Sequence, residues 1–504
     1  MATPANVVDL SYLSSYDHII DDRRGASRLS DDHEEFTMLD RSDLLEAPMH
    51  RTLHLLKAPL QDDGAPTTYS SRVLGTVSVV AITYMFGTAG PIGSESIVAE
   101  GGPLVALLGF LIYPLVFSAP YALVITELST AFPEDGGFTI WAMNAFGPFW
   151  SIQVGYWSWV SGILSLAIFP QLLLDACARF TTVDIHHGEY FVKAAIGVVL
   201  ALPSLAGTRL ISRSCVLLTA LVLSVLLLFS IWGLASPDTS KLHIVLHART
   251  MNDDDSASHQ PIPWVEILNN LYWNFEGIRM ASVFGGQVRN PAGVYARAVW
   301  IVIALTVATY VLPLLATMIS ASRAWQQFDM GAYELAAERL GGRGLRAVVL
   351  ALSFASCVGL FSAGVFCCST EISGMAENRL LPAFLATRNA PFGSPHFAIL
   401  VSLAVAVACC PVANAFSGFV TITIFLSAIE IRRAMPYIPR PSRVPGGVAV
   451  LVMLSIVPLA VCACIIVKTL TTSALGVGLI VGFSLPPFVY AAIRNYRKKT
   501  LLYR

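Results

Sequence analysis

Long, nearly uncharged apolar stretches recur along most of this chain and constrain its fold more than any other feature. About twelve of them follow residue 70, and each is close to or above the roughly 20 residues that a helix needs to cross a bilayer. Lys, Arg, Asp and Glu make up 13% of the 504 residues, whereas an average soluble protein has about 25%. We therefore expect an all-α polytopic membrane protein with about twelve transmembrane helices in contact with the lipid bilayer. The stretches lie at about 71–99, 102–130, 147–178, 189–207, 210–236, 263–288, 297–320, 346–373, 396–412, 414–431, 446–470 and 473–493.

The same composition excludes several other classes. Disordered chains are rich in charge and poor in apolar residues, and the net charge of −1 provides no basic patch for nucleic acid. The nine Cys lie in or beside apolar stretches without CxxC spacing, so they read as buried small hydrophobes rather than as disulfides or zinc ligands. A membrane enzyme would need paired acids and histidines near a membrane face, and the ten His show no such grouping. We expect no catalysis, no metal site and no cofactor.

Residues 1–70 form a different kind of segment. They carry acidic clusters such as Asp21-Asp22 and no long apolar run, which predicts a mostly disordered acidic tail. Arg and Lys are more frequent in alternate loops and in the basic tail at 494–504 than in the remaining loops. This asymmetry follows the positive-inside rule. It predicts that both termini are cytosolic and that the helical domain lies between them at 71–493.

Two of the apolar stretches, the first and the sixth, contain helix-breaking or charged residues. The first contains Gly87, Gly90, Pro91 and Gly93, and glycine and proline both favour local unwinding. The sixth contains Asn274, Glu276, Gly277 and Arg279. Matched breaks five spans apart indicate an inverted-repeat transporter whose substrate binds at the unwound segments. Repeat one would cover about 71–236 and repeat two about 263–431, with two additional helices at about 446–493. The alternative interpretation is that these glycines only permit close helix packing.

Glu276 and Arg279 are the most informative charges, because an ionised side chain at mid-membrane costs at least about 2.5 kcal/mol. At a spacing of three on a helix they are positioned to pair. Glu276 would then either bind a substrate ammonium or carry a coupled proton, or be neutralised by Arg279 as a gate or structural pair. Glu95, after the first break, is either a coupling or gating acid that faces the outer vestibule or an ordinary helix-end acid.

Other residues give weaker signals. Tyr156, with Trp157 and Trp159, would supply either an aromatic wall for a cation or ordinary packing. Glu127, near the end of the second stretch, is interpreted as structural. The polar connection at 323–346 predicts a solvated surface helix.

Five segments resemble one family, the amino acid–polyamine–organocation permeases, and most closely their eukaryotic polyamine uptake branch in plants and trypanosomatids. The longest is GPIGSESIVAEGGPLVALLGFLIYPLVFSAPYALVITELSTAFPEDGGFTIWAMNAFGPFW, and the others are GYWSWVSGILSLAIFPQLLLD, GGQVRNP, SGMAENRLLP and RPSRVPGG. The resemblance implies a five-plus-five inverted repeat with two further helices. It also implies secondary active transport by alternating access, commonly coupled to a proton or another cation. In the family the two breaks bind the substrate, and the matching positions here are Gly90, Pro91, Ile92, Gly93, Phe275, Glu276, Gly277 and Ile278.

This chain departs from the polyamine branch at charged positions of the pocket. Ser165 stands where those relatives carry an acid, Arg279 stands in place of an Asp, and Glu276 replaces a neutral residue. The substrate therefore stays open between a polyamine, which needs carboxylates, and an amino acid, whose carboxylate Arg279 would bind. A proton is the expected coupling ion on family grounds, and a sodium ion bound by serines of the eighth stretch is the alternative. The plasma membrane is the expected location. A non-transporting sensor or channel with the same fold is the alternative function.

Overall fold

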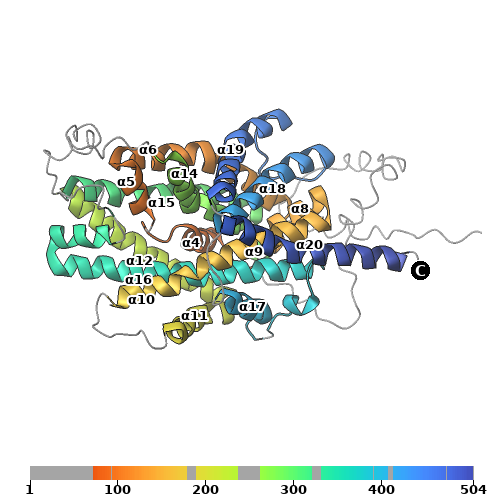
Figure 1. Ribbon diagram of the computed structural model, residues 1–504, viewed down its shortest axis with the longest axis horizontal. Coiled ribbons are helices and arrows are strands. Elements are labelled where there is room, and N and C mark those ends of the chain that lie inside the picture. Colours follow the sequence, from red (N-terminus) through yellow and green to blue (C-terminus); the bar gives the residue numbers. More distant parts are fainter. Residues whose placement is uncertain are drawn as a thin grey trace, which may run out of the picture. The chain divides into compact units, whose positions relative to one another are not determined.

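Helices make up nearly all of the regular structure in the computed structural model, which describes residues 72–91, 93–178, 189–235, 262–320, 328, 331–389, 391–406, 413–472 and 474–502. No strand occurs among these residues (Figure 1). Within them, seven helices are long and apolar enough to cross a membrane, and four shorter apolar helices accompany them. The interrupted helix α14 accounts for the remaining expected span. The all-α multi-pass membrane fold is therefore confirmed, whereas the predicted acidic tail lies outside the described residues.

The first half of the domain follows the expected spans closely. One difference is the short helix α8, whose apolar sequence FTIWAMNAF connects the second and third spans and is too short to cross a bilayer. A second is a π-helical turn, η2, that begins at Pro114 within the second span, where proline has no N–H for the regular helical bond. The elements are α4 (Thr76–Gly87), α5 (Ser94–Gly101), α6 (Pro103–Tyr113), η2 (Pro114–Ser118), α7 (Ala119–Ala131), α8 (Phe138–Phe146), α9 (Pro148–Leu166), α10 (Ile168–Ala178), α11 (Glu189–Leu205) and α12 (Thr208–Ala235).

The second half contains one long helix, α16, that changes direction at Gly341 and Gly342, where the backbone is not helical. The last helix, α20, continues to Leu502, so it includes most of the segment expected as a basic tail. The elements are α14 (Trp264–Phe275), η3 (Glu276–Ser282), η4 (Gly285–Gln287), α15 (Pro291–Ser320), α16 (Ala332–Glu377), η6 (Ala383–Ala386), α17 (His396–Ala406), α18 (Ala413–Ala434), α19 (Val448–Thr472) and α20 (Ala474–Leu502). Residues 407–412, the end of the expected ninth span, lie outside the described residues.

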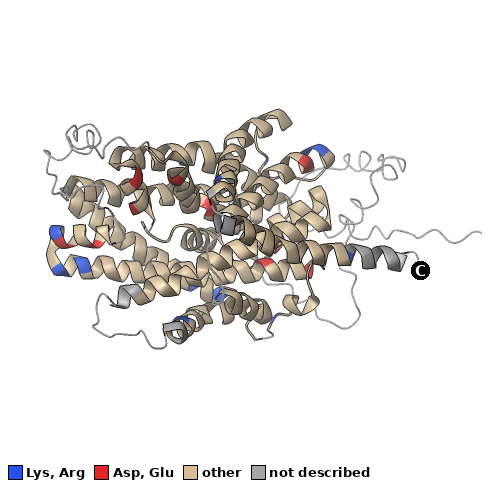
Figure 2. Ribbon diagram, in the orientation of Figure 1, with Lys and Arg blue, Asp and Glu red and all other residues tan. Residues whose placement is uncertain are grey.

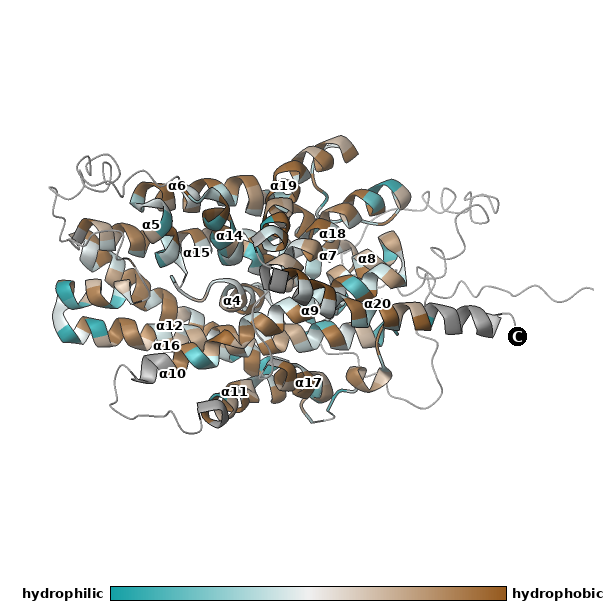
Figure 3. Cartoon of the chain, in the orientation of Figure 1, coloured by the Kyte–Doolittle hydropathy of each residue, from teal (hydrophilic) through white to brown (hydrophobic). Residues whose placement is uncertain are grey.

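Charged residues are sparse along the helices and more frequent near their ends (Figure 2). Apolar residues cover most helical faces (Figure 3), and several are strongly exposed, such as Leu217 and Met453 at 70% each. An exposed apolar face of this extent is unfavourable in water and is what a lipid-facing helix requires. The composition of the chain and the exposed apolar faces of its helices therefore both indicate that the protein lies in a lipid bilayer.

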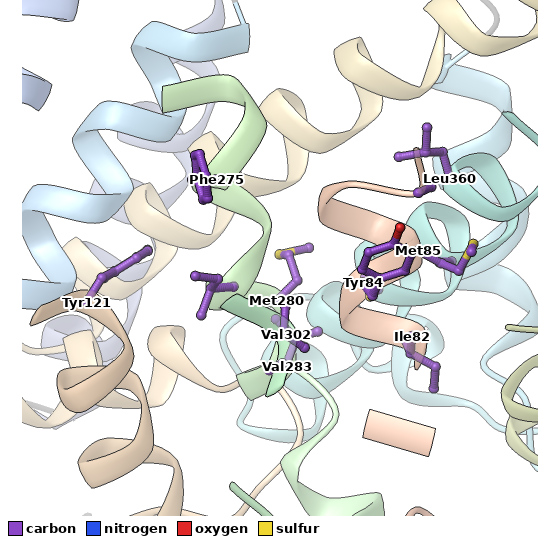
Figure 4. Packing of buried hydrophobic residues seen from close by; sticks show 14 of the residues in the cluster. Ile82, Tyr84, Met85, Tyr121, Phe275, Met280, Val283, Val302 and Leu360 are labelled. Carbon is purple, nitrogen blue, oxygen red and sulfur yellow. The ribbon is translucent and has the colours of Figure 1, made fainter. Parts of the chain in front are cut away.

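Both expected breaks are present in the structure. The first span ends as α4 at Gly87 and resumes as α5 at Ser94, after Gly90 and Gly93 adopt φ values of 147° and 91° that favour glycine. The sixth span ends as α14 at Phe275 and continues in the tighter 3₁₀ turns of η3. Figure 4 shows side chains of α4, including Tyr84 and Met85, in one packed region with Met280 of η3. The two interrupted spans therefore adjoin at the centre of the core.

The helix predicted for the polar connection before the eighth span is present as the first part of α16, but the expectation that it is solvated was wrong in part. Tyr333, Ala336 and Ala337 are buried. The Tyr333 hydroxyl lies 2.6 Å from Ser94 Oγ, at the start of α5. The apolar face of this segment and Glu334 therefore pack into the domain, whereas Arg339 and Arg343 remain exposed.

Candidate functional site

The two broken helices approach each other through a pair of glycines. A Cβ built on Gly87 would lie 3.0 Å from Cα of Gly277, and a Cβ on Gly277 would overlap Cα of Gly87. Cβ atoms essentially never come closer than 3.0 Å to such neighbours. The breaks therefore touch backbone to backbone, which only glycine at both positions permits.

The start of α5 is occupied by the chain's own carboxylate. Gly93, the residue before α5, donates its backbone N–H to Glu95 Oε2 at 2.9 Å, and the Ser94 hydroxyl donates to the Pro91 carbonyl at 2.6 Å. A helix N-terminus attracts an anion, because its first N–H groups lack helical partners. Glu95 thus occupies the position at which a carboxylate of a bound molecule would otherwise be favoured.

A small cavity of about 40 Å³ lies beside the two breaks. A water molecule occupies about 30 Å³ in the liquid, so the cavity accommodates about one water and no amine or amino acid in this conformation. A larger depression of about 580 Å³, at α11 and the start of α17, is open and mainly apolar, and it lies away from both breaks. The small cavity is lined by Phe86, Gly87, Thr88, Ser161, Gly162, Ser165, Leu166, Phe169, Trp273, Glu276, Gly277, Arg279 and Leu360.

Glu276 and Arg279 form the ion pair that their spacing predicts. Arg279 Nε donates to Glu276 Oε1, and the hydroxyl of Ser417 in α18 donates to the same oxygen. The Arg279 guanidinium also lies over the ring of Phe138 in α8, with 5.5 Å between its Cζ and the ring centroid. The Arg279 side chain is 1% exposed, whereas that of Glu276 is 14% exposed. The carboxylate is therefore the more accessible partner of the pair.

A second carboxylate, Glu371 of α16, lies on the other side of Arg279. The Arg279 Nη1 donates to Ser158 Oγ at 2.5 Å, and the Ser158 hydroxyl donates to Glu371 Oε2 at 3.0 Å. Glu371 is fully buried, and its Oε1 has no hydrogen-bond partner among the described residues. One buried guanidinium is thus shared between two carboxylates, directly with Glu276 and through a serine with Glu371.

Hydroxyl groups extend this network toward α7. Tyr272 donates to Ser417 Oγ at 2.9 Å and lies 3.0 Å from Thr421 Oγ1, which in turn lies 3.4 Å from the Tyr121 hydroxyl. Hydroxyls orient a carboxylate without adding charge. Glu276 is therefore held directly by Ser417 of α18 and by Arg279 of its own segment, and Tyr272 of α14 orients Ser417.

Polar contacts also connect the ends of several helices at the N-terminal face, which we define as the end of the domain where α4 begins and α7 and α16 end. Arg388 Nη2 lies 2.8 Å from both Asp135 Oδ2 and Glu377 Oε1. Asp135 accepts from Gly286 N at 3.0 Å and from Gln287 Nε2 at 3.1 Å. Burial raises the pKa of the Asp135 carboxyl above its ordinary value, although Arg388 and Gln287 favour its ionised form. These contacts, which we call the Asp135 cluster, hold the sixth span, the α7–α8 loop and the end of α16 together.

A second ion pair supports the same face. Arg432 of α18 pairs with Glu127 of α7, and Glu127 also accepts from Val444 N at 2.7 Å. Both side chains are nearly fully buried. Glu127 thus connects α7 with α18 and with the segment after it, which agrees with the structural role expected from its place in the sequence.

The opposite face, where α5 ends and α14 begins, also has polar contacts, among them a partly exposed ion pair in which Lys468 Nζ of α19 lies 2.6 Å from Glu266 Oε1 of α14. Asn270 Nδ2 lies 3.3 Å from Glu100 Oε2, and Tyr310 donates to Asn274 Oδ1 at 2.8 Å. Together with the contact between Tyr333 and Ser94, they connect the two interrupted spans with α15 and α16. Polar contacts thus hold the helices together toward both faces of the domain.

The structure brings some of the predicted site residues together and separates others. Glu276, Gly277 and Arg279 line the cavity, and so does Ser165. The other described candidates, Gly90, Pro91, Gly93, Glu95, Tyr156, Phe275 and Ile278, are not among the lining residues, and Ile92 lies outside the described residues. Within this group, Gly90, Pro91, Gly93 and Glu95 form the first break, and Phe275 packs against Tyr113 and Tyr310.

Two polar residues of this network were not predicted from the sequence. Glu371 lies in the apolar run FCCSTEISGM of the eighth span, and the rule that singled out Glu276, an acid inside a span, also applies to it. Ser158 carried no such signal, because hydroxyl residues are common in membrane helices. Among the described residues, no group of three or more His, Cys, Asp or Glu is arranged to hold a metal ion.

Two interrupted helices that meet at a buried, charged cavity within a multi-pass helical domain define the transporter class of membrane proteins. A family model described as "Amino acid permease" matches residues 74–485. A probable polyamine transporter of Arabidopsis thaliana is 30% identical over 445 residues, which cover 85% of this chain and 90% of that protein. The polyamine transporter PUT1 of Oryza sativa subsp. japonica is 30% identical over 457 residues, covering 88% and 82%.

More distant proteins also match. The cationic amino acid transporter 1 of Schizosaccharomyces pombe is 24% identical over 369 residues, covering 68% of this chain and 60% of that protein. The crystal structure of MhsT in complex with L-phenylalanine superimposes with a TM-score of 0.55 at 11% identity, over 79% of this chain and 99% of MhsT. That likeness concerns the fold alone. This chain belongs to the amino acid permease family.

Proposed function

We propose that this protein is a secondary transporter that carries a small cationic amine, either a polyamine or a basic amino acid, across the plasma membrane by alternating access. The observation that carries the proposal is the placement of Glu276. Its carboxylate lines the cavity between the two broken helices, and it is more exposed than its partner Arg279. An accessible carboxylate in a low-dielectric site favours a cation over an anion or a neutral solute.

Two further contacts favour a cation as the substrate. The Arg279 guanidinium is buried and already engaged by Glu276 and Ser158, so it offers little to a substrate carboxylate. Glu95 occupies the N-terminus of α5, where a carboxylate would also bind. The names of the relatives, polyamine transporters and a cationic amino acid transporter, agree with this substrate class.

The contacts at the two faces suggest how access would alternate. The cavity is too small for an amine, so binding requires the helices at one face to separate. The contacts of the opposite face, including the partly exposed ion pair of Lys468 with Glu266, would open for uptake, and the Asp135 cluster would open for release. We place the N-terminal face and both termini in the cytosol and expect coupling to a proton.

Uptake into reconstituted vesicles tests the proposal. We expect saturable uptake of labelled putrescine, spermidine or arginine that exceeds uptake of leucine and changes with a pH gradient. The variant Glu276→Gln should lose uptake of the cations, whereas Glu338→Gln should behave like the parent, because Glu338 lies outside the network in an ion pair with Arg346.

Three results would contradict the proposal. Binding without uptake would indicate a sensor, and non-saturating flux of the amines would indicate a channel. Unchanged cation uptake by Glu276→Gln, with the variant correctly inserted, would exclude the role of Glu276 in binding.

A further inference from the structure

Glu371 is a fully buried carboxyl group, and the proposed binding of substrate at Glu276 does not use it. It receives a single hydrogen bond, from Ser158, and its Oε1 has no partner among the described residues. A buried carboxylate with so few hydrogen bonds is unfavourable while it is ionised and much less so as the neutral acid. Glu371 can therefore be stabilised in two ways, either by binding a proton or by pairing with a nearby positive charge.

The geometry connects the charge of Glu371 to the partner of Arg279. Arg279 reaches Glu276 through Nε and reaches Ser158 through Nη1, and the Ser158 hydroxyl reaches Glu371. When Glu371 is neutral, the guanidinium has one anionic partner, Glu276. When Glu371 is ionised, it attracts the guanidinium through the same serine, and the hold of Arg279 on Glu276 weakens.

Counting charges gives the direction of the coupling. With Glu371 protonated, the three groups Glu276, Arg279 and Glu371 sum to zero. With Glu371 ionised they sum to −1, and one positive charge from a substrate at Glu276 restores zero. Uncompensated charge in a buried site is costly. The empty site therefore favours protonated Glu371, and the site with a substrate cation at Glu276 favours ionised Glu371.

We propose, on the basis of the function proposed above, that Glu371 is the proton-coupling group and that a proton on Glu371 and a cationic group at Glu276 displace one another. When the substrate binds, the O–H bond of the Glu371 acid breaks and the proton leaves to water at the open face. Arg279 then shifts toward Glu371, and the substrate cation pairs with Glu276. The cycle is thus an exchange of protons for cations at one buried triad.

Few other groups are positioned to perform this role. Among the described residues, the charged groups around Glu371 are Arg279 and Glu276 of η3, and the titratable neighbours on its own helix are the thiols of Cys367 and Cys368. Both thiols are buried and lack an ion-pair partner among the described residues. Tyr272 is connected to Glu276 through Ser417, but a phenol ordinarily ionises only at about pH 10. Within the described part of the chain, Glu371 is therefore the carboxyl group besides Glu276 that this network connects to Arg279.

Proton release on binding tests the proposal without requiring transport. Putrescine, and arginine in parallel, would be titrated into the purified full-length protein in detergent at several pH values, with binding heats measured in two buffers of different ionisation enthalpy. We expect a proton to be released on binding, and the affinity to fall by up to about tenfold for each unit of decreasing pH, as for competition with a single proton.

Variants separate Glu371 from other acids. Glu371→Gln should bind the amines with an affinity independent of pH, close to that of the parent at low pH, and without proton release. Glu371→Asp, which keeps a titratable group, should retain a pH dependence, and Glu338→Gln should match the parent. Monodisperse elution of each variant checks that it is folded.

The outcomes distinguish this inference from the proposed function. Amine binding without proton release, tighter amine binding at low pH, or an unchanged pH profile in Glu371→Gln would overturn the role of Glu371 and leave the carrier assignment intact. If neither amine binds the parent protein and no amine is taken up, the proposed function fails and this inference fails with it.

Discussion

The contact between Gly87 and Gly277 gives the most direct test of how the two broken helices pack. In Gly277→Ala, the new methyl group overlaps Cα of Gly87 and lies 3.0 Å from Gly87 N and 3.3 Å from Phe86 Cδ1. Two of these three neighbours are backbone atoms, which cannot rotate away as a side chain does. The substitution therefore has to push α4 and η3 apart at the centre of the core.

The magnitude follows from the distances. Overpacking in a well-packed interior typically costs about 1–3 kcal/mol, and we expect Gly277→Ala to lie at the upper end. Gly87→Ala, whose Cβ lies 3.0 Å from Gly277 Cα and 3.6 Å from its N and C atoms, should lie at the lower end. Gly482→Ala in α20 is a matched control, because nothing lies within 4 Å of its Cβ, and alanine there should change stability by about 1 kcal/mol or less.

Unfolding in mixed micelles with increasing sodium dodecyl sulfate, followed by tryptophan fluorescence, measures the three variants on one scale. Uptake of labelled amine in vesicles gives KM and maximal rate for the same proteins, and we expect Gly277→Ala to impair both. If Gly277→Ala unfolds at the parental detergent fraction with unchanged uptake, the backbone contact does not hold the two breaks together.

Three further substitutions test individual contacts. Arg388→Ala leaves Asp135 buried without its guanidinium, and we expect a loss of about 3–5 kcal/mol in the free energy of unfolding in the same detergent titration; parental stability would show that Arg388 is dispensable. Arg432→Met should cost less than this, because Arg440 Nε lies 3.4 Å from Glu127 Oε1 and remains as a partner of the buried carboxylate; a loss as large as that of Arg388→Ala would refute this. Gly93→Ala places a side chain at a φ of 91° and should cost about 1–3 kcal/mol, with lower amine affinity in the binding titration; an unchanged affinity would argue against a role for this break in the site.

Several features of the fold were predictable from local sequence alone. Apolar length fixed the helical class, and Gly90, Gly93 and Pro91 located the first break, because their backbone preferences do not depend on distant contacts. The pairing of Glu276 with Arg279 followed from a spacing of three residues. Helix α8 was missed because nine apolar residues between two spans are too few to be recognised as a further crossing.

The positions of individual side chains around the cavity were harder to predict. Tyr156 and Ser165 belong to the same helix, yet Ser165 lines the cavity and Tyr156 packs beside Trp159 instead. Which face of an apolar helix is turned inward depends on its neighbours, because in lipid both faces are apolar and the hydrophobic pattern carries little information.

Local sequence properties establish that this chain is a multi-pass membrane protein with two matched helix breaks and with Glu276 and Arg279 inside the sixth span. These properties follow from the cost of burying charge and from the backbone preferences of single residues, both of which are local. The sharing of Arg279 between Glu276 and Glu371 is apparent only in three dimensions, since these acids lie on segments almost a hundred residues apart and meet through Ser158 of a third helix. The chemistry of the site depends on that convergence, and convergence of distant segments is a property of packing.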